Sequence, residues 1–188
     1  MTTNAEQLTG TDLLRRRHEE IKTLFAQTLE LRGDEKVEAW DCLRATLATH
    51  EVVEEMFVHP LAKHLGPDGA RIAQARLDEE AQATQVLSDL EDLGVDGDQF
   101  APRLLAFQRA VVEHAEAEER ELFPLLEASC SAADMETLAD SILVSEQLTP
   151  THPHPHSSQN PIALMLTGPF VAMVDKARDH FKKSTHHN

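Results

Sequence analysis

Residues 50–60 read HEVVEEMFVHP and residues 114–124 read HAEAEERELFP, and these two copies of one pattern decide the fold. Each copy is His-x-x-x-Glu-Glu, followed by a large side chain nine residues after the His and then by Pro. A four-residue step places a His and a Glu one turn apart on the same face of a helix. Two helices that each present one imidazole and one carboxylate can supply the ligands of a dinuclear metal site inside a helical bundle.

The apolar residues around both copies recur at steps of three and four, which predicts long amphipathic helices. We expect helices over residues 11–33, 34–65, 70–93 and 99–128, with breaks at Gly-Pro-Asp-Gly 66–69 and Gly-Val-Asp-Gly 94–97. Pro60 and Pro124 are expected to kink or end their helices. Four long helices with short connections predict an all-α, up-down-up-down four-helix bundle over residues 11–128.

Residues 129–188 are predicted to add C-terminal helices that pack on this bundle. A capping box at residues 131–134 should start a helix that runs to about residue 147. His152, His154 and His156 then alternate with Pro in an extended strap, which could chelate a metal weakly or simply be solvated. A last amphipathic helix is expected over about residues 162–183, since its apolar residues are too many to leave in water.

The composition narrows the class of protein. A chain of 188 residues with 7 Gly and no Tyr favours one helical domain. The net charge of −16 makes nucleic acids and anionic membranes poor partners. No stretch approaches the roughly 18 apolar residues of a membrane span, and no signal peptide is evident. Two distant cysteines suit a reducing compartment, so we expect a cytoplasmic protein.

Three histidines and three glutamates occupy positions that the apolar pattern reserves for the core: His18, His50, His114, Glu54, Glu80 and Glu118. Burying a carboxylate without a partner costs several kcal/mol or more. No Lys or Arg falls on the same helix faces, so a pair of metal ions is the expected partner. Glu54 and Glu118 could each bridge both ions, with His18 and Glu80 adding one ligand to each. Imidazole and carboxylate ligands without thiolate favour iron or manganese.

His59 and a set of other glutamates lie outside these six positions. His59 points near the same face as His50, so it could be a ligand, a neighbour of the ligands, or a surface His at a helix end. Other glutamates of these helices are expected on solvated faces: Glu19, Glu20, Glu51, Glu55, Glu79, Glu116, Glu119 and Glu121.

The pattern His…His-x-x-x-Glu…His…His-x-x-x-Glu over residues 11–128 resembles the hemerythrin-like family, the HHE cation-binding domain, and the tail resembles its actinobacterial members. The resemblance implies a four-helix bundle with a non-haem, oxygen-bridged di-iron centre. It also implies that Glu54 and Glu118 bridge the irons. The iron ligands that it implies are His18, His50, Glu54, His114 and Glu118. The family has a His where Glu80 aligns, so Glu80 is either a carboxylate ligand or no ligand.

Open coordination positions on redox-active ions would suit chemistry with a small oxidant. The leading expectation is hydrogen peroxide decomposition, in a role in oxidative stress, by two bridged irons for which manganese or zinc could substitute. The first alternative is non-enzymatic binding or sensing of dioxygen, nitric oxide or iron. The second is a helical interaction protein with a vestigial site. The sequence leaves the oligomeric state open.

Overall fold

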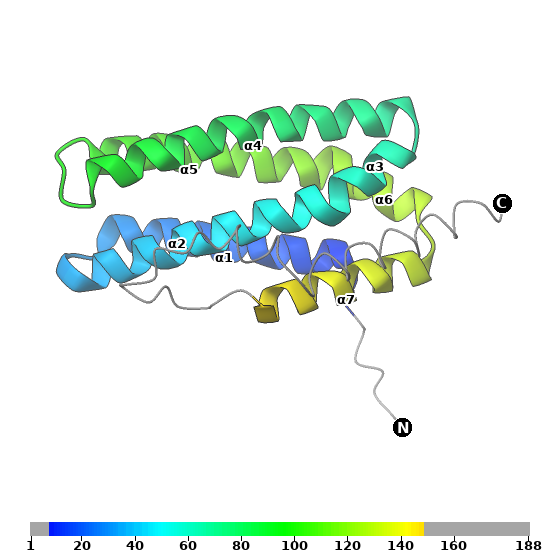
Figure 1. Ribbon diagram of the computed structural model, residues 1–188, viewed down its shortest axis with the longest axis horizontal. Helices are drawn as coiled ribbons and strands as arrows, with labels where there is room; N and C mark the ends of the chain where they lie inside the picture. The colour runs from blue at the N-terminus through cyan, green and yellow to red at the C-terminus, as the bar shows by residue number, and fades with distance from the viewer. Residues whose placement is uncertain (1–7, 149–188) are drawn as a thin grey trace, which may run out of the picture.

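The computed structural model describes residues 8–148, and this part of the chain is helical with no strand. Figure 1 shows α1 beside α2 and α4 beside α5, with α7 running along α1 and α2. This is the predicted all-α, up-down-up-down bundle with an added C-terminal helix. Its elements are α1 (Gly10–Glu30), α2 (Gly33–Val53), η1 (Glu54–Val58), α3 (His59–His64), α4 (Pro67–Leu93), α5 (Phe100–Ala117), η2 (Glu118–Leu122), α6 (Phe123–Ser129) and α7 (Ala132–Leu148).

The first helix begins at Gly10, one residue before the predicted start, and a capping box fixes this end. The Thr9 hydroxyl accepts from the Asp12 backbone N–H, and the Asp12 carboxylate accepts from the Thr9 backbone N–H. The prediction that Gly33 ends this helix is wrong, because α1 stops at Glu30 and Gly33 is the first residue of α2. Gly33 has φ of +57°, a backbone conformation that side chains with a Cβ rarely adopt.

The break expected at residues 66–69 is shorter than predicted. Of these four residues only Gly66 stands outside a helix, because α3 ends at His64 and α4 already begins at Pro67. Proline is tolerated in a first turn, where its missing N–H would have no helical partner. A Cβ on Gly69 would lie 2.1 Å from the Ala62 carbonyl oxygen, so glycine permits the close approach of α3 and α4.

The two prolines of the repeated pattern do not end their helices. In both copies a single π-helical turn, η1 or η2, precedes the proline, and the chain stays helical from Gly33 to His64 and from Phe100 to Ser129. Such turns mark an inserted residue in an α-helix and occur often at functional sites. Both π-helical turns begin at a glutamate of the motif, Glu54 or Glu118.

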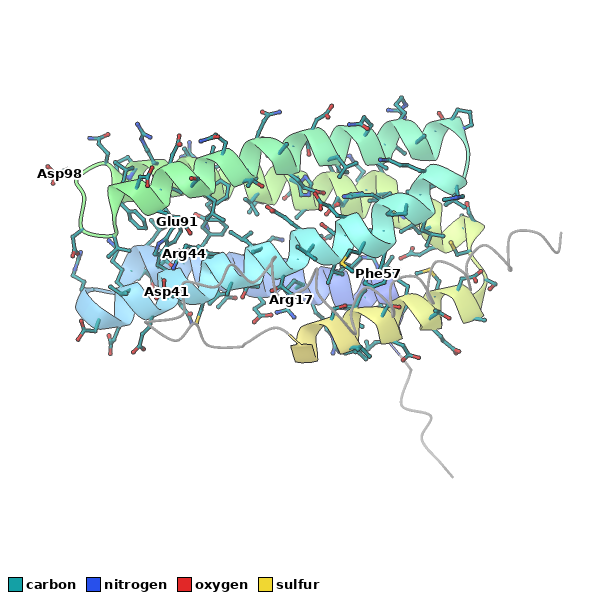
Figure 2. All side chains as sticks on the ribbon, viewed as in Figure 1. Arg17, Asp41, Arg44, Phe57, Glu91 and Asp98 are labelled. Carbon is teal, nitrogen blue, oxygen red and sulfur yellow. The ribbon has the colours of Figure 1, made fainter. Side chains whose placement is uncertain are left out.

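The core consists of two apolar clusters stacked along the bundle. The second cluster lies toward the 94–99 turn, where the Trp40 and Phe100 rings meet edge to face at 5.1 Å. Figure 2 shows Arg44 of α2 directed at Glu91 of α4 near this end, where its Nη1 lies 2.5 Å from the Glu91 Oε1. The first cluster contains Leu14, Val53, Phe57, Val58, Leu61, Ala62, Ala73, Leu122, Phe123, Leu126, Met135, Leu138 and Ile142. The second contains Ile21, Phe25, Trp40, Leu43, Leu47, Leu90, Phe100, Leu104 and Phe107.

Helix α7 closes one side of the first cluster. Ser131 and Asp134 form the predicted capping box at its start. Met135, Leu138 and Ile142 face the core, and a Cβ on Gly10 of α1 would lie 2.4 Å from Leu138. The strap with His152, His154 and His156 and the last predicted helix lie outside the described residues. The division into domains therefore stays a prediction. No helix within residues 8–148 is long and apolar enough to cross a membrane.

Candidate metal centre

The six core positions that the sequence pattern selected meet between the two apolar clusters. Each lies along its helix between residues of the first and second cluster, so the site is at mid-bundle. The exposed fractions show how deeply five of these residues are buried: Glu54 0%, Glu118 0%, His18 2%, Glu80 5% and His50 6%. The side chain of His114 is 14% exposed and faces the same centre.

Ligand-type atoms form two groups that share two carboxylates. In each group every residue offers one atom, and these atoms all lie within 4.8 Å of one another. Glu54 and Glu118 belong to both groups, which is the arrangement expected of two carboxylates between two cations. The first group is His18, His50, Glu54 and Glu118, and the second is Glu54, His59, Glu80 and Glu118.

The first group brings two imidazoles against the shared carboxylates. The His18 and His50 rings meet edge to face with centroids 4.9 Å apart. The His18 Nε2 lies 3.3 Å from the Glu118 Oε2, and the His50 Nε2 lies 3.4 Å from the Glu54 Oε2. These separations leave the nitrogen and oxygen atoms facing a common point rather than closely hydrogen-bonded.

The second group is built around Glu80. The His59 Nε2 lies 2.6 Å from the Glu80 Oε1 in a buried contact. The His114 Nε2 lies 3.9 Å from the Glu80 Oε1 and 3.6 Å from the Glu118 Oε2. His114 thus stands beside the second group without being one of its four members.

His59 is 1% exposed, so the alternative that it is a surface residue is wrong. In a regular α-helix nine residues turn by about 900°, which would place His59 roughly opposite His50, so a regular helix does not support the predicted placement on the same face. The π-helical turn η1 absorbs one extra residue and rotates His59 back toward the site. In the second copy η2 brings Phe123 to the matching position, where its ring stacks on His18 at 5.6 Å.

Two glutamates hold the outer nitrogens of two site histidines. The His18 Nδ1 lies 2.8 Å from the Glu119 Oε1, and the His114 Nδ1 lies 2.8 Å from the Glu79 Oε2. A carboxylate that accepts from Nδ1–H leaves the Nε2 lone pair directed at the centre and makes it more basic. Expecting Glu79 and Glu119 on purely solvated faces was therefore wrong. Each neighbours a site glutamate in a Glu-Glu pair, which is the signal that could have identified it.

One buried arginine contradicts the expectation that no cation shares these helix faces. Arg76 of α4 is 8% exposed and lies one turn before Glu80. Its Nη2 pairs with the Glu79 Oε1 at 2.8 Å. Glu79 thus contacts both Arg76 and His114, and this pair of contacts fixes the orientation of the His114 imidazole at the edge of the site. This ion pair engages Glu79 and leaves the carboxylates of the two ligand groups to another partner.

Burial and charge shift the protonation of the site. Burial first, and then the negative charges of Glu118 and Glu80, hold the pKa of Glu54 well above its ordinary value. Burial also lowers the pKa of His50, with positive charge at His18 adding to it. The pKa of Glu118 is lowered, because its contacts with His18 and His114 outweigh the effect of burial. Glu51 is half-buried, and burial with the charge of Glu80 raises its pKa to about 7.

The polar atoms that face the centre are those a cation would satisfy. Buried polar atoms are normally hydrogen-bonded, and a cluster of exceptions needs an explanation. Here carboxylate oxygens and imidazole nitrogens converge without thiolate, a ligand set that suits iron or manganese. The atoms of the shared carboxylates and their neighbours that are buried without a hydrogen bond include Glu54 Oε1 and Oε2, Glu118 Oε1 and Oε2, Glu80 Oε2 and His18 Nε2. The residues present therefore fit a bound metal pair.

Comparisons with known proteins also indicate a cation-binding domain. A model of the hemerythrin HHE cation binding domain matches residues 9–126. An uncharacterized hemerythrin-like protein of Schizosaccharomyces pombe is 30% identical over 138 residues, which are 73% of this chain and 68% of that protein. The crystal structure of a hemerythrin HHE cation binding domain-containing protein from Mycobacterium kansasii matches with a TM-score of 0.69 and 19% identity. That match covers 91% of this chain and 99% of the other, and it shows a shared fold.

Proposed function

The chain belongs to the hemerythrin HHE cation-binding domain family, and on that premise we propose that it holds two iron ions and decomposes hydrogen peroxide. The observation that carries the proposal is the pair of ligand groups sharing Glu54 and Glu118. A single-ion site would need one group. Two groups with two common carboxylates supply a separate set of terminal ligands for each of two ions.

Each ion would have its own terminal ligands. His18 and His50 would hold the first ion, and Glu80, His114 and His59 would hold the second. Glu54 and Glu118 would belong to both. Manganese or zinc could occupy the same ligands, since each accepts imidazole and carboxylate.

The protein's own side chains organise this site. When bound, the iron pair would supply the Lewis acidity and redox equivalents for converting two hydrogen peroxide molecules into two waters and dioxygen. Glu119 and Glu79 fix the His18 and His114 rings through their Nδ1 atoms. The clusters above and below the site line the bundle axis with apolar side chains.

Glu80 favours turnover over reversible carriage of dioxygen. Its position corresponds by sequence offset to that of His18, so one half of the site has a carboxylate where the other has an imidazole. An extra negative charge stabilises the higher oxidation state of a bound metal and offsets its greater charge. A reversible carrier depends on a reduced state that survives exposure to dioxygen, which this charge opposes.

The test is peroxide consumption by the full chain after iron loading. We expect many turnovers, with one dioxygen released for every two peroxides consumed. Glu118→Ala should lose both iron and activity, whereas Glu116→Ala changes an exposed residue of the same helix and should keep both. Formation of a single oxygen adduct without peroxide consumption would support a carrier or sensor instead.

A further inference from the structure

A cavity of about 320 Å³ reaches the site from the side of the second apolar cluster. Its inner end is lined by His18, His50, Glu80 and His114. Its outer lining includes Gln82, Val86 and Glu113, which lie at the surface of the described part of the chain. A path therefore connects the surface to one face of the candidate metal site.

The cavity is much larger than hydrogen peroxide requires. A cavity of only roughly 10–15 Å³ can hold one water molecule. Hydrogen peroxide has just one oxygen atom more than water, so it needs little more space. A volume of about 320 Å³ falls within the roughly 300–1,000 Å³ range of pockets that bind small organic molecules. The space between the surface and the site is thus suited to a molecule with an organic part.

The walls of the cavity are apolar and its inner end is polar. Most of the lining surface is apolar, so an apolar group would displace solvent favourably there. At the inner end, imidazole and carboxylate groups can receive a polar head. The apolar wall is formed by Ile21, Leu47, Ala83, Val86, Phe107 and Val111.

The charges around the cavity select against an anionic ligand. Glu79 and Glu113 line it together with Glu51, and Lys22 is its one basic lining residue. The Lys22 amine is also held 2.7 Å from the Glu19 carboxylate. In the outer part of the cavity a carboxylate or phosphate would meet Glu113 and Glu51, offset only by a Lys22 that is already paired, in a chain whose net charge is −16. A neutral molecule meets no such repulsion.

We propose that this cavity binds the organic part of a neutral alkyl or aryl hydroperoxide and places its hydroperoxyl group at the inner end, beside His50, Glu80 and His114. The inference rests on the proposed function and names its substrate class. The reaction is R–OOH + 2 R′SH → R–OH + H₂O + R′S–SR′, with a low-molecular-weight thiol as the external reductant. The O–O bond breaks and the S–S bond forms. The two thiol protons and the hydroperoxide proton end on the alcohol and water.

Binding can be tested without turnover by using unreactive alcohols as probes. Each buried methylene should tighten binding about fourfold, so 1-hexanol should bind the full chain roughly tenfold or more tighter than 1-butanol. Isothermal titration calorimetry measures this on metal-free and iron-loaded protein alike. Equal affinity for the two alcohols would overturn the inference.

Two variants narrow the cavity and one matched control does not. Ala83→Leu and Val86→Phe add bulk to its wall, whereas Ala81→Leu makes the same change as the first at an exposed position of α4 outside the lining. We expect each wall variant to weaken 1-hexanol binding at least tenfold and to lower kcat/KM for cumene hydroperoxide similarly. Hydrogen peroxide consumption should stay within twofold in all three. Val86→Phe changes a partly exposed residue, so it tests the cavity even if Ala83→Leu fails to fold.

The outcomes separate this inference from the proposed function. If both wall variants bind 1-hexanol like the parent protein while hydrogen peroxide is still consumed, the substrate assignment is overturned and the proposed function stands. If the chain binds 1-hexanol in the cavity but holds no iron and consumes no hydrogen peroxide, the proposed function fails and only the binding site remains.

Discussion

At the scale of single residues, the site is held by carboxylates that lie outside the two ligand groups. Glu119 and Glu79 each accept from the Nδ1 of a site histidine at 2.8 Å. Such contacts fix the tautomer and orientation of a ligating imidazole. The sequence could indicate that His18 and His114 face inward, but not which partner their outer nitrogens would find, because that depends on contacts between helices far apart in the chain.

Replacing Glu119 should weaken metal binding without removing a ligand. We expect Glu119→Ala to lower iron affinity by about 10- to 100-fold, because the His18 ring loses its orientation. Competition with a coloured chelator measures the change. Glu116→Ala alters an exposed neighbour on the same helix and serves as the control. Equal affinities in the two variants would show that the Glu119 contact is dispensable.

Replacing His59 with Phe, the residue at the matching position of the second copy, should weaken the binding of one iron ion more than that of the other. His59→Phe removes the contact with Glu80 and leaves the first group intact. We expect one tightly bound iron per chain and a second that is lost on dialysis, as measured by elemental analysis. His64→Phe makes the same exchange at an exposed position and should keep both irons. Two tightly held irons in His59→Phe would exclude His59 as a ligand.

Glu51 should make the metal-free protein less stable as pH rises. Its pKa is raised to about 7 from an ordinary 4.5, so the folded state keeps a proton that the unfolded chain has lost. Stability therefore falls between about pH 4.5 and 7, by at most about 3.4 kcal/mol from this group. In urea unfolding, Glu51→Gln should lose that part of the pH dependence, and Glu55→Gln, an exposed neighbour, should not. Parallel curves for Glu51→Gln and the parent protein would refute this.

At the scale of elements, the sequence predicted the long helices well and their interruptions poorly. Apolar steps of three and four located α1, α2, α4 and α5 and put six site residues on their inner faces. The π-helical turns were not predicted, because an inserted residue leaves no local signal in the sequence. It is recognised only from the orientation of the helix that follows it. Those turns decide the position of His59. Arg76 was missed because its burial accompanies an ion pair with Glu79, which the apolar pattern does not indicate.

The crossing of α3 and α4 depends on one glycine. A Cβ on Gly69 would meet the Ala62 carbonyl oxygen at 2.1 Å, and backbone cannot yield as a side chain can. We expect Gly69→Ala to destabilise the fold by about 1–3 kcal/mol, as overpacking commonly does. Equilibrium unfolding in urea measures it. An unchanged midpoint would mean that the helices separate at little cost.

At the scale of the whole molecule, the bundle stabilises its own metal site and should depend on it. Two apolar clusters bury three carboxylates between them, and burying carboxylates without a cation is costly. Iron bound at a hundred times its dissociation constant would add about 3 kcal/mol for each site. We expect thermal unfolding of the metal-free protein at a clearly lower temperature than that of the loaded protein. Identical transitions would show that the metal does not support the fold.

The most direct test of the central claim is the number of ions that Glu54 and Glu118 hold together. Metal-free protein would be titrated anaerobically with ferrous iron, and bound iron per chain would be counted. The shared carboxylates predict two irons per chain, and loss of both in Glu54→Ala and in Glu118→Ala, while Glu55→Ala still binds two. Binding of one iron, or two irons retained in either site variant, would contradict a centre built on shared carboxylates.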